Sequence, residues 1–240
     1  MSFDIKLADK VIHINNLYPE LKEFCKDYIV EHTTPEFSVT ITQEDIVYEQ
    51  EHSLEQSFSP AYLETLGVLR QIAEVFPNYN RLLIHGASIS YNNQAFLFTA
   101  PSGTGKSTHI RLWKKYLGEQ VKIVNGDKPF IHISENETTI YGTPWAGKER
   151  WHRNCNAPLN AICFVRRGTT NSIRRITPEE CLPLLLNQVY IPEDSVAVGL
   201  TLELMDQLLK NVPLYLLHCD MSEGAVRCSF ETLTGLPYPN

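Results

Sequence analysis

The chain has 240 residues, 43% hydrophobic and 20% charged, with a formal net charge of −7, which suits a globular protein with a full core. The acidic balance argues against a broad basic surface for nucleic acid, and no apolar run reaches the roughly 18 residues of a membrane span. Six cysteines without a C-x-x-C pair, and an N-terminus unlike a signal peptide, predict a cytoplasmic protein with reduced thiols.

The first 80 residues are predicted to form a small α/β region. Three short apolar or alternating runs are predicted strands: 3–7, 11–14 and 37–42. Two runs with apolar residues at helical spacing are predicted helices: 17–30 and 62–76. We therefore expect residues 1–80 to be an N-terminal appendage and residues 81–240 to be the core.

The core alternates strands and helices, which predicts a mixed α/β fold. Short apolar runs predict strands at 82–85, 95–99, 121–125, 130–133, 139–141, 161–165 and 214–217. Asn92-Asn93 and Glu135–Glu137 are predicted turns of two hairpins. Helices are predicted at 107–117, after the capping box at Thr177, around Leu200–Leu209, and at 222–233.

The segment from Ala100 to Thr108 indicates the clearest chemistry. It fits G-x-x-x-x-G-K-[S/T], with Ala100 in place of the first glycine, between a predicted strand and a predicted helix. Glycine at 103 and 105 lets successive N–H groups face a polyphosphate, and the helix N-terminus adds positive charge. The residues predicted to bind the phosphates of a nucleotide are Ser102, Gly103, Thr104, Gly105, Lys106, Ser107 and Thr108. The alternative is a glycine-rich surface turn with a chance lysine.

Two further segments supply candidate residues for phosphoryl transfer. Asp127 follows a predicted strand that we expect beside the strand before the loop, and it is predicted to hold Mg²⁺ together with Ser107 or to act as a base. The alternative is an ordinary turn aspartate. Lys148 and Arg150 lie in a segment rich in tryptophan and cations, and they are predicted to neutralise charge. The alternative there is a loop of solvated cations with anchoring tryptophans.

Two arginine pairs, 166–167 and 174–175, follow the predicted strand at 161–165. Such pairs are more typical of a solvated face than of a phosphate contact.

The segment from Ala100 to Thr108 resembles the P-loop shared by HPr kinase/phosphorylase and ATP-dependent phosphoenolpyruvate carboxykinase. The run 83–86 is similar to the strand before that loop in HPr kinases, and the likeness is best over 81–130. The run 144–148 looks like a segment of short HPr-kinase-like proteins associated with peptide modification. The resemblance implies a P-loop core of the HPr kinase C-terminal domain/carboxykinase type, with His85 near the γ-phosphate and Asp127 binding Mg²⁺ or activating the acceptor. Gly126 stands where the family has a first acid.

The prediction from these residues is an ATP-binding, Mg²⁺-dependent kinase that transfers the γ-phosphoryl group to a hydroxyl on a small molecule, peptide or protein. Two alternatives remain open at this point. One is a nucleotide-binding sensor with reduced catalysis, which the missing acid at Gly126 motivates. The other is a partner-binding protein of a peptide-modification pathway, whose N-terminal segment would bind a leader peptide.

Overall fold

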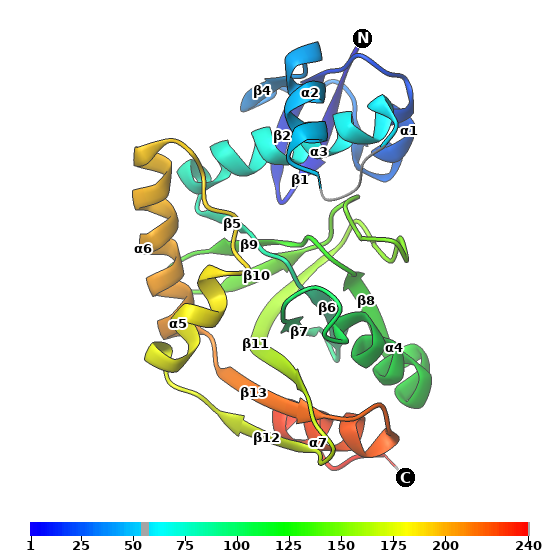
Figure 1. The fold of residues 1–240 in the computed structure, drawn as a ribbon, viewed down its shortest axis with the longest axis vertical. Coiled ribbons are helices and arrows are strands. Elements are labelled where there is room, and N and C mark those ends of the chain that lie inside the picture. Colours follow the sequence, from blue (N-terminus) through cyan, green and yellow to red (C-terminus); the bar gives the residue numbers. More distant parts are fainter. Residues whose placement is uncertain (54–57, 240) are drawn as a thin grey trace.

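The computed structural model describes residues 1–53 and 58–239. Over these residues the strands form two sheets, one of four strands and one of nine. The small sheet and its helices lie at one end of the molecule, and the large sheet makes up the rest (Figure 1). All six cysteines are unpaired, and none of the helices in the described ranges is long and apolar enough to cross a membrane.

The small sheet has the order β3-β1-β2-β4. Strands β1 (Ser2–Leu7) and β2 (Lys10–Asn15) pair antiparallel, and β4 (Phe37–Thr40) runs parallel to β2. The alternation of both hairpin strands buries Ile5, Leu7, Ile12 and Ile14 completely. Helix α3 (Pro60–Val75) covers this core, starting at Ser59, whose side chain accepts from the N–H of Tyr62.

One local prediction for this region was wrong, and one helix was not predicted. The helix expected over 17–30 is only α1 (Glu20–Phe24), followed by a 3₁₀ turn (Lys26–Tyr28) and by β3 (Ile29–Val30). The two β-branched residues of β3 extend the sheet by pairing with β1, which ends the helical run. Helix α2 (Gln43–Glu51) was missed because it is short and polar. It begins with a capping box between Thr42 and Asp45.

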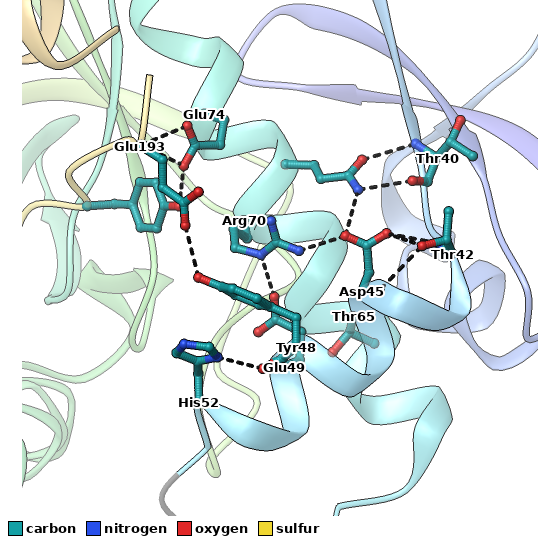
Figure 2. Close-up of polar contacts among 12 residues, drawn as sticks. Thr40, Thr42, Asp45, Tyr48, Glu49, His52, Thr65, Arg70, Glu74 and Glu193 are labelled. Atoms are coloured by element: carbon teal, nitrogen blue, oxygen red, sulfur yellow. Dashed lines mark hydrogen bonds and ion pairs between the residues drawn. The ribbon is translucent and has the colours of Figure 1, made fainter. Parts of the chain in front are cut away.

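A polar network joins helices α2 and α3 to the segment around Glu193 (Figure 2). Arg70 on α3 contacts Asp45 at 2.7 Å and Glu49 at 2.6 Å, which fixes α2 against α3. Glu74 accepts from the N–H of Glu193 at 3.0 Å, and the Tyr48 hydroxyl donates to Glu193 at 3.0 Å. Helices α2 and α3 therefore hold the segment around Glu193 in place.

The large sheet is built around three parallel strands, β7 (Gln94–Thr99), β11 (Asn156–Arg167) and β13 (Leu214–Cys219). Strand β11 lies between the other two, with Phe164 opposite Thr99 on β7. The carboxyl ends of the three strands therefore meet at one edge, where α/β folds place their ligands.

Antiparallel strands complete the large sheet. They are β5 (Arg81–Leu83), β6 (Ala87–Tyr91), β8 (Val121–Asn125), β9 (Phe130–Ile133), β10 (Thr138–Tyr141) and β12 (Ser172–Arg175). The predicted β6–β7 and β9–β10 hairpins are confirmed, the first turning at Asn92-Asn93 with positive φ at both residues. Strand β8 pairs with β6 and not with β7, so the strand before Asp127 is one position further from the loop than expected.

Helices cover both faces of the parallel strands. Phe96 and Phe98 point to one face, where α4 (Lys106–Leu117) and α7 (Glu223–Thr234) pack with Trp113 and Phe230. Leu97 points to the other face, against α5 (Pro178–Leu186) and α6 (Ser195–Asn211). Alternation along β7 thus separates the two layers and anchors the start of the glycine-rich loop.

Candidate functional site

The glycine-rich loop, residues 100–105, connects β7 to α4. Gly103 has φ +75° and Gly105 has φ +123°, and a Cβ at either position would meet nothing within 4 Å. Glycine is therefore required for backbone conformation and not for space. Ala100, which replaces the first glycine of the motif, is 2% exposed and packs into the α4–α7 core. The methyl group of Ala100 fills space in this core that a glycine would leave empty.

The main-chain N–H groups at the end of this loop face outward from the helix start. The N–H of His109 bonds to the carbonyl of Gly105 at 2.9 Å, which is the first turn of α4. Within the described residues, the N–H groups of 105–107 have no acceptor. These donors and the positive end of the helix dipole together form an anion-binding environment.

Lys106 lies folded against its own loop. Its Nζ donates to the carbonyl of Ala100 at 2.9 Å and to that of Pro101 at 3.4 Å, and the residue is 6% exposed. Burial lowers the pKa of Lys106, and the carboxylate of Asp127 partly offsets that shift. Within the described chain, the Nζ of Lys106 donates only to carbonyl oxygens. A phosphate anion would therefore be a stronger partner for this buried cation.

Asp127 and His85 form a pair beside this lysine. The Nε2 of His85 lies 3.3 Å from Oδ1 of Asp127, and Nδ1 lies 3.1 Å from Oε1 of Gln188. Burial favours a higher pKa for Asp127, but the hydrogen bond from His85 and the charges of Lys128, His85 and Lys106 outweigh it and lower the pKa. Asp127 is therefore an ionised carboxylate that interacts with the side chains of His85 and Lys106.

The turn after β8 fixes the backbone of Asp127. The buried side chain of Asn125 accepts from the N–H of Asp127 at 2.8 Å and from that of Lys128 at 2.7 Å. Its amide donates to the carbonyl of Thr143 at 2.9 Å, and Gly86 N–H donates to the carbonyl of Asp127 at 2.8 Å. The turn thus presents the carboxylate toward His85 from a rigid base.

Gly126 is glycine because another segment occupies its side-chain space. A Cβ at Gly126 would lie 2.8 Å from the carbonyl oxygen of Ala146 and 3.4 Å from that of Trp151. An acid at this position would require that backbone to move. Among the described residues there is no cluster of three or more His, Cys, Asp or Glu that could hold a metal ion. The candidate oxygen ligands are therefore Asp127 and the Ser107 hydroxyl.

The segment that blocks Gly126 is called the strap here and comprises residues 144–154. Trp145 is 5% exposed and belongs to the core of the N-terminal region, where its indole N–H donates to the carbonyl of Thr65 at 2.7 Å. Gly147, with φ +72°, passes over Asp127 so closely that a Cβ would lie 3.1 Å from the Cβ of Asp127. Lys148 and Arg150 follow as exposed residues on this stretch.

Arg167 lies on an exposed face, as expected for this arginine pair, and it also contacts the glycine-rich loop. Its Nε donates to the carbonyl of Thr104 at 3.2 Å and its Nη2 to that of Gly103 at 2.5 Å. The pairing of Phe164 with Thr99 brings the end of β11 beside the loop, and no signal in the sequence gives that register. Arg174, in contrast, forms a surface ion pair with Glu180 at 2.7 Å.

Two cavities flank the loop. The α5-side cavity, about 600 Å³, is lined by residues 99–104, 164–167, Leu184, Asn187 and Gln188. The α4-side cavity, about 440 Å³, is lined by residues 103–105, Thr108, His109, Leu112, 165–168 and 219–221. Gln188, which contacts His85, places the first cavity on the side of the Asp127–His85 pair.

Comparisons with known proteins give no match of sequence and a weak structural likeness. No family model and no curated protein sequence matches the chain. Among solved structures, the HPr(Ser) kinase/phosphatase from Coxiella burnetii aligns with 64% of this chain and 99% of its own, at 12% identity and a TM-score of 0.36. A likeness at this level indicates neither the fold class nor the role of any residue.

Proposed function

We propose that the chain is a Mg²⁺-dependent phosphotransferase that moves the γ-phosphoryl group of ATP to a hydroxyl on a small molecule, peptide or protein, in the manner of HPr kinases. In this proposal residues 81–240 form the catalytic P-loop core and residues 1–80 an appendage. The observation that carries the proposal is the juxtaposition of the loop and Lys106 with the Asp127–His85 pair, since Thr99, directly before the loop, donates to the carbonyl of His85 at 2.7 Å.

The glycine-rich loop supports phosphate binding by three independent features. Its backbone has the positive φ angles that turn successive amides to one side, its end is a helix N-terminus, and Lys106 adds a buried cation. Phosphoryl transfer needs charge stabilisation and positioning more than covalent chemistry from the protein. Donors fixed before the substrate arrives supply that stabilisation without reorganisation.

In the proposed reaction, the acceptor oxygen forms a bond to the γ-phosphorus while the bond from that phosphorus to the β,γ-bridging oxygen breaks, releasing ADP. The acceptor proton goes to the carboxylate of Asp127, whose Oδ1 lies 3.3 Å from Nε2 of His85. Lys106, and the exposed cations Lys148 and Arg150 if the strap turns them inward, neutralise charge on the transferred group.

The donor set fits Mg²⁺, a hard cation that prefers carboxylate and hydroxyl oxygens. Asp127 has a lowered pKa and is ionised, and Ser107 stands at the first turn of α4. When bound, the ion would offset the charge of the β- and γ-phosphates. The carboxylate of Asp127 and the hydroxyl of Ser107 are therefore the proposed ligands of Mg²⁺.

The proposal is tested by titrating ATP into the wild-type chain and the Lys106→Ala variant in a calorimeter. Loss of a charge-assisted contact to phosphate is expected to weaken ATP binding by at least about tenfold. Lys115→Ala is the matched control because Lys115 is an exposed lysine on the same helix. Equal ATP affinity in wild type and Lys106→Ala would refute the phosphate site and, with it, the kinase.

A nucleotide sensor is the second candidate, and the packing at Gly126 favours it. The Ala146 carbonyl excludes a second acid, so one carboxylate must both bind metal and accept the proton. A single-turnover assay with γ-labelled ATP and a panel of hydroxyl acceptors separates the two functions. Label on an acceptor selects the kinase, whereas Lys106-dependent ATP binding without transfer to any acceptor selects the sensor.

A further inference from the structure

We propose that the α5-side cavity binds the phosphoryl acceptor, and that this acceptor is a small hydroxyl compound with an anionic group held by Arg166. This inference rests on the proposed function and adds the chemical class of the substrate. The cavity has a volume of about 600 Å³. Cavities of this size enclose a whole small molecule, so we assign the small molecule among the three acceptor classes left open.

Gln188 connects this cavity to the Asp127–His85 pair. The N–H of His85 donates to the main-chain carbonyl of Gln188 at 2.7 Å, and Nδ1 of His85 lies 3.1 Å from Oε1 of Gln188. Gln188 lines the α5-side cavity and not the α4-side cavity. A hydroxyl that gives its proton to Asp127 therefore belongs to a molecule that extends into the α5-side cavity.

The lining of this cavity carries positive charge and no negative charge. It includes Arg166 and Arg167 and no aspartate or glutamate, in a chain whose formal net charge is −7. The lining of the α4-side cavity, in contrast, includes Asp220. The α5-side lining favours an anion, because an anion there is attracted to arginine and meets no carboxylate that would repel it.

The two arginines have different neighbours because side chains alternate along β11. Arg167 shares the face of Val165, and its guanidinium donates to two carbonyls of the glycine-rich loop. Arg166 shares the face of Phe164, which packs in the core beneath α5 and α6. Arg166 is exposed, and its guanidinium has no partner among the described residues. Arg166 is therefore the cation available to a ligand on the α5 side.

The rest of the lining suits the body of such a molecule. Gln188 is 6% exposed, and because its Oε1 faces His85, its amide N–H₂ group has no acceptor within the described chain. A buried donor of this kind favours a ligand acceptor. Phe164 and Leu184 offer apolar contact. Arg166 lies two residues beyond Phe164, roughly 7 Å along the strand, so the anionic group is held away from the reacting hydroxyl.

Arg166 has a positioning role in the proposed reaction. The acceptor oxygen forms the bond to the γ-phosphorus, the bond to the β,γ-bridging oxygen breaks, and the proton goes to Asp127 as ADP leaves. Arg166 takes no part in these steps, and it orients the hydroxyl by binding the other end of the molecule. Loss of Arg166 is therefore expected to lower the affinity for the acceptor and not the affinity for ATP.

The first test uses two probes that differ in charge, 4-(hydroxymethyl)benzoate and 4-(hydroxymethyl)benzamide. Both carry the hydroxyl and the polar group at opposite ends of a flat apolar ring. Each is titrated in a calorimeter into the wild-type chain saturated with Mg²⁺ and β,γ-imido-ATP. The benzoate is expected to bind at least about tenfold more tightly than the benzamide. No measurable binding of the benzoate, equal affinity for both probes, or competition of the benzoate with the nucleotide overturns the assignment.

A third probe, 4-(hydroxymethyl)phenylphosphonate, identifies the anionic group in the same titration. A tighter benzoate indicates a carboxylate substrate, and a tighter phosphonate indicates a phosphorylated one. Both results support an anionic acceptor, whereas a phosphonate that binds no better than the benzamide overturns it together with the benzoate result.

Arg166→Gln removes the charge from an exposed side chain and leaves the core intact. The preference for the benzoate is expected to fall from at least about tenfold to less than about twofold, with ATP affinity within about twofold of wild type. Arg175→Gln is the matched control, because Arg175 is an exposed arginine on β12, and it should retain the preference. An unchanged preference in Arg166→Gln, or a loss of ATP affinity in its place, refutes the role of Arg166.

A matched pair of leucine variants locates the probe. Leu184 and Leu112 are both half-buried on helices, and Leu184 lines only the α5-side cavity, whereas Leu112 lines only the α4-side cavity. Leu184→Trp is expected to weaken benzoate binding by at least about tenfold and to leave ATP affinity within about twofold. Leu112→Trp should leave benzoate binding within about twofold. The opposite pattern would place the probe in the other cavity.

Failure of this inference is distinguishable from failure of the proposed function. If Lys106→Ala weakens ATP binding but wild type shows no preference for the benzoate, the phosphate site stands and only the acceptor class falls. If Lys106→Ala leaves ATP affinity unchanged, the phosphate site is wrong and the acceptor assignment falls with it.

Discussion

The glycine-rich loop leads to Lys106, which interacts electrostatically with Asp127, and the strap passes Asp127 at Gly147, yet the two segments are held in opposite ways. The loop leaves the N–H groups of 105–107 without acceptors in the described chain and is touched by one arginine from outside. The strap is fixed at both ends to the N-terminal region, through Trp145 in its core and through Asn154, which donates to the carbonyl of Asp27 at 2.7 Å.

The difference separates groups that serve a ligand from groups that serve the fold. Unpaired donors in the loop add nothing to folding stability, so their effect is expected in ligand binding. Buried side chains in the strap contribute apolar area and hydrogen bonds, so their effect is expected in stability and in the placement of Asp127.

Trp145→Ala is expected to give the largest effect. Removing a fully packed indole and its bond to Thr65 should lower the free energy of unfolding by about 3–5 kcal/mol. For a chain of this size that corresponds to a fall of roughly 6–20 °C in Tm, measured by circular dichroism. Arg150→Ala, at an exposed strap residue, is the control and should stay within about 0.5 kcal/mol. Equal Tm values for the two variants would contradict the anchoring of the strap.

His109 lies one turn after the loop, on α4, but it is buried in the core. Its effect is therefore expected in stability and not in ligand binding. Its pKa of about 4 lies below the ordinary value of 6.5, so the unfolded chain binds the proton first as pH falls. The stability is present above pH 6.5 and is lost toward pH 4, about 2 kcal/mol of it by pH 5. Urea midpoints at pH 7.5 and pH 5 measure this loss, and His109→Gln should flatten the dependence. An identical pH slope in the variant would contradict the prediction.

Asp127→Asn tests the point where the loop and the strap meet. The amide keeps the shape and the contact with His85 but removes the charge that attracts Mg²⁺. The factor by which Mg²⁺ tightens ATP binding, relative to EDTA, should fall by at least about tenfold, with ATP affinity in EDTA little changed. Asp206→Asn serves as the control. A normal response to Mg²⁺ in Asp127→Asn would remove this carboxylate from the site.

The same division explains which features could be predicted from sequence. The start of α4 and both core hairpins depend on residues close together in the chain, such as Gly105 and the Asn92-Asn93 turn, and these predictions are confirmed. The blocked space at Gly126 depends on the Ala146 carbonyl, twenty residues away, and the burial of Trp145 depends on Thr65. Such contacts are set by tertiary packing, which local patterns do not encode.

Arg167→Met gives the smallest expected effect and tests the loop most directly. The exposed guanidinium bonds only to the carbonyls of Gly103 and Thr104 among the described residues, so its loss should change stability by less than about 0.5 kcal/mol. It should nevertheless weaken ATP binding by about threefold to tenfold. Without the two contacts from Arg167 the loop would be more mobile, and it would have to be ordered when the phosphates bind. Arg175→Met, at an exposed arginine on β12, should change neither quantity. If Arg167→Met lowered the Tm as Trp145→Ala does, the loop would also be a structural segment, and the contrast with the strap would no longer hold.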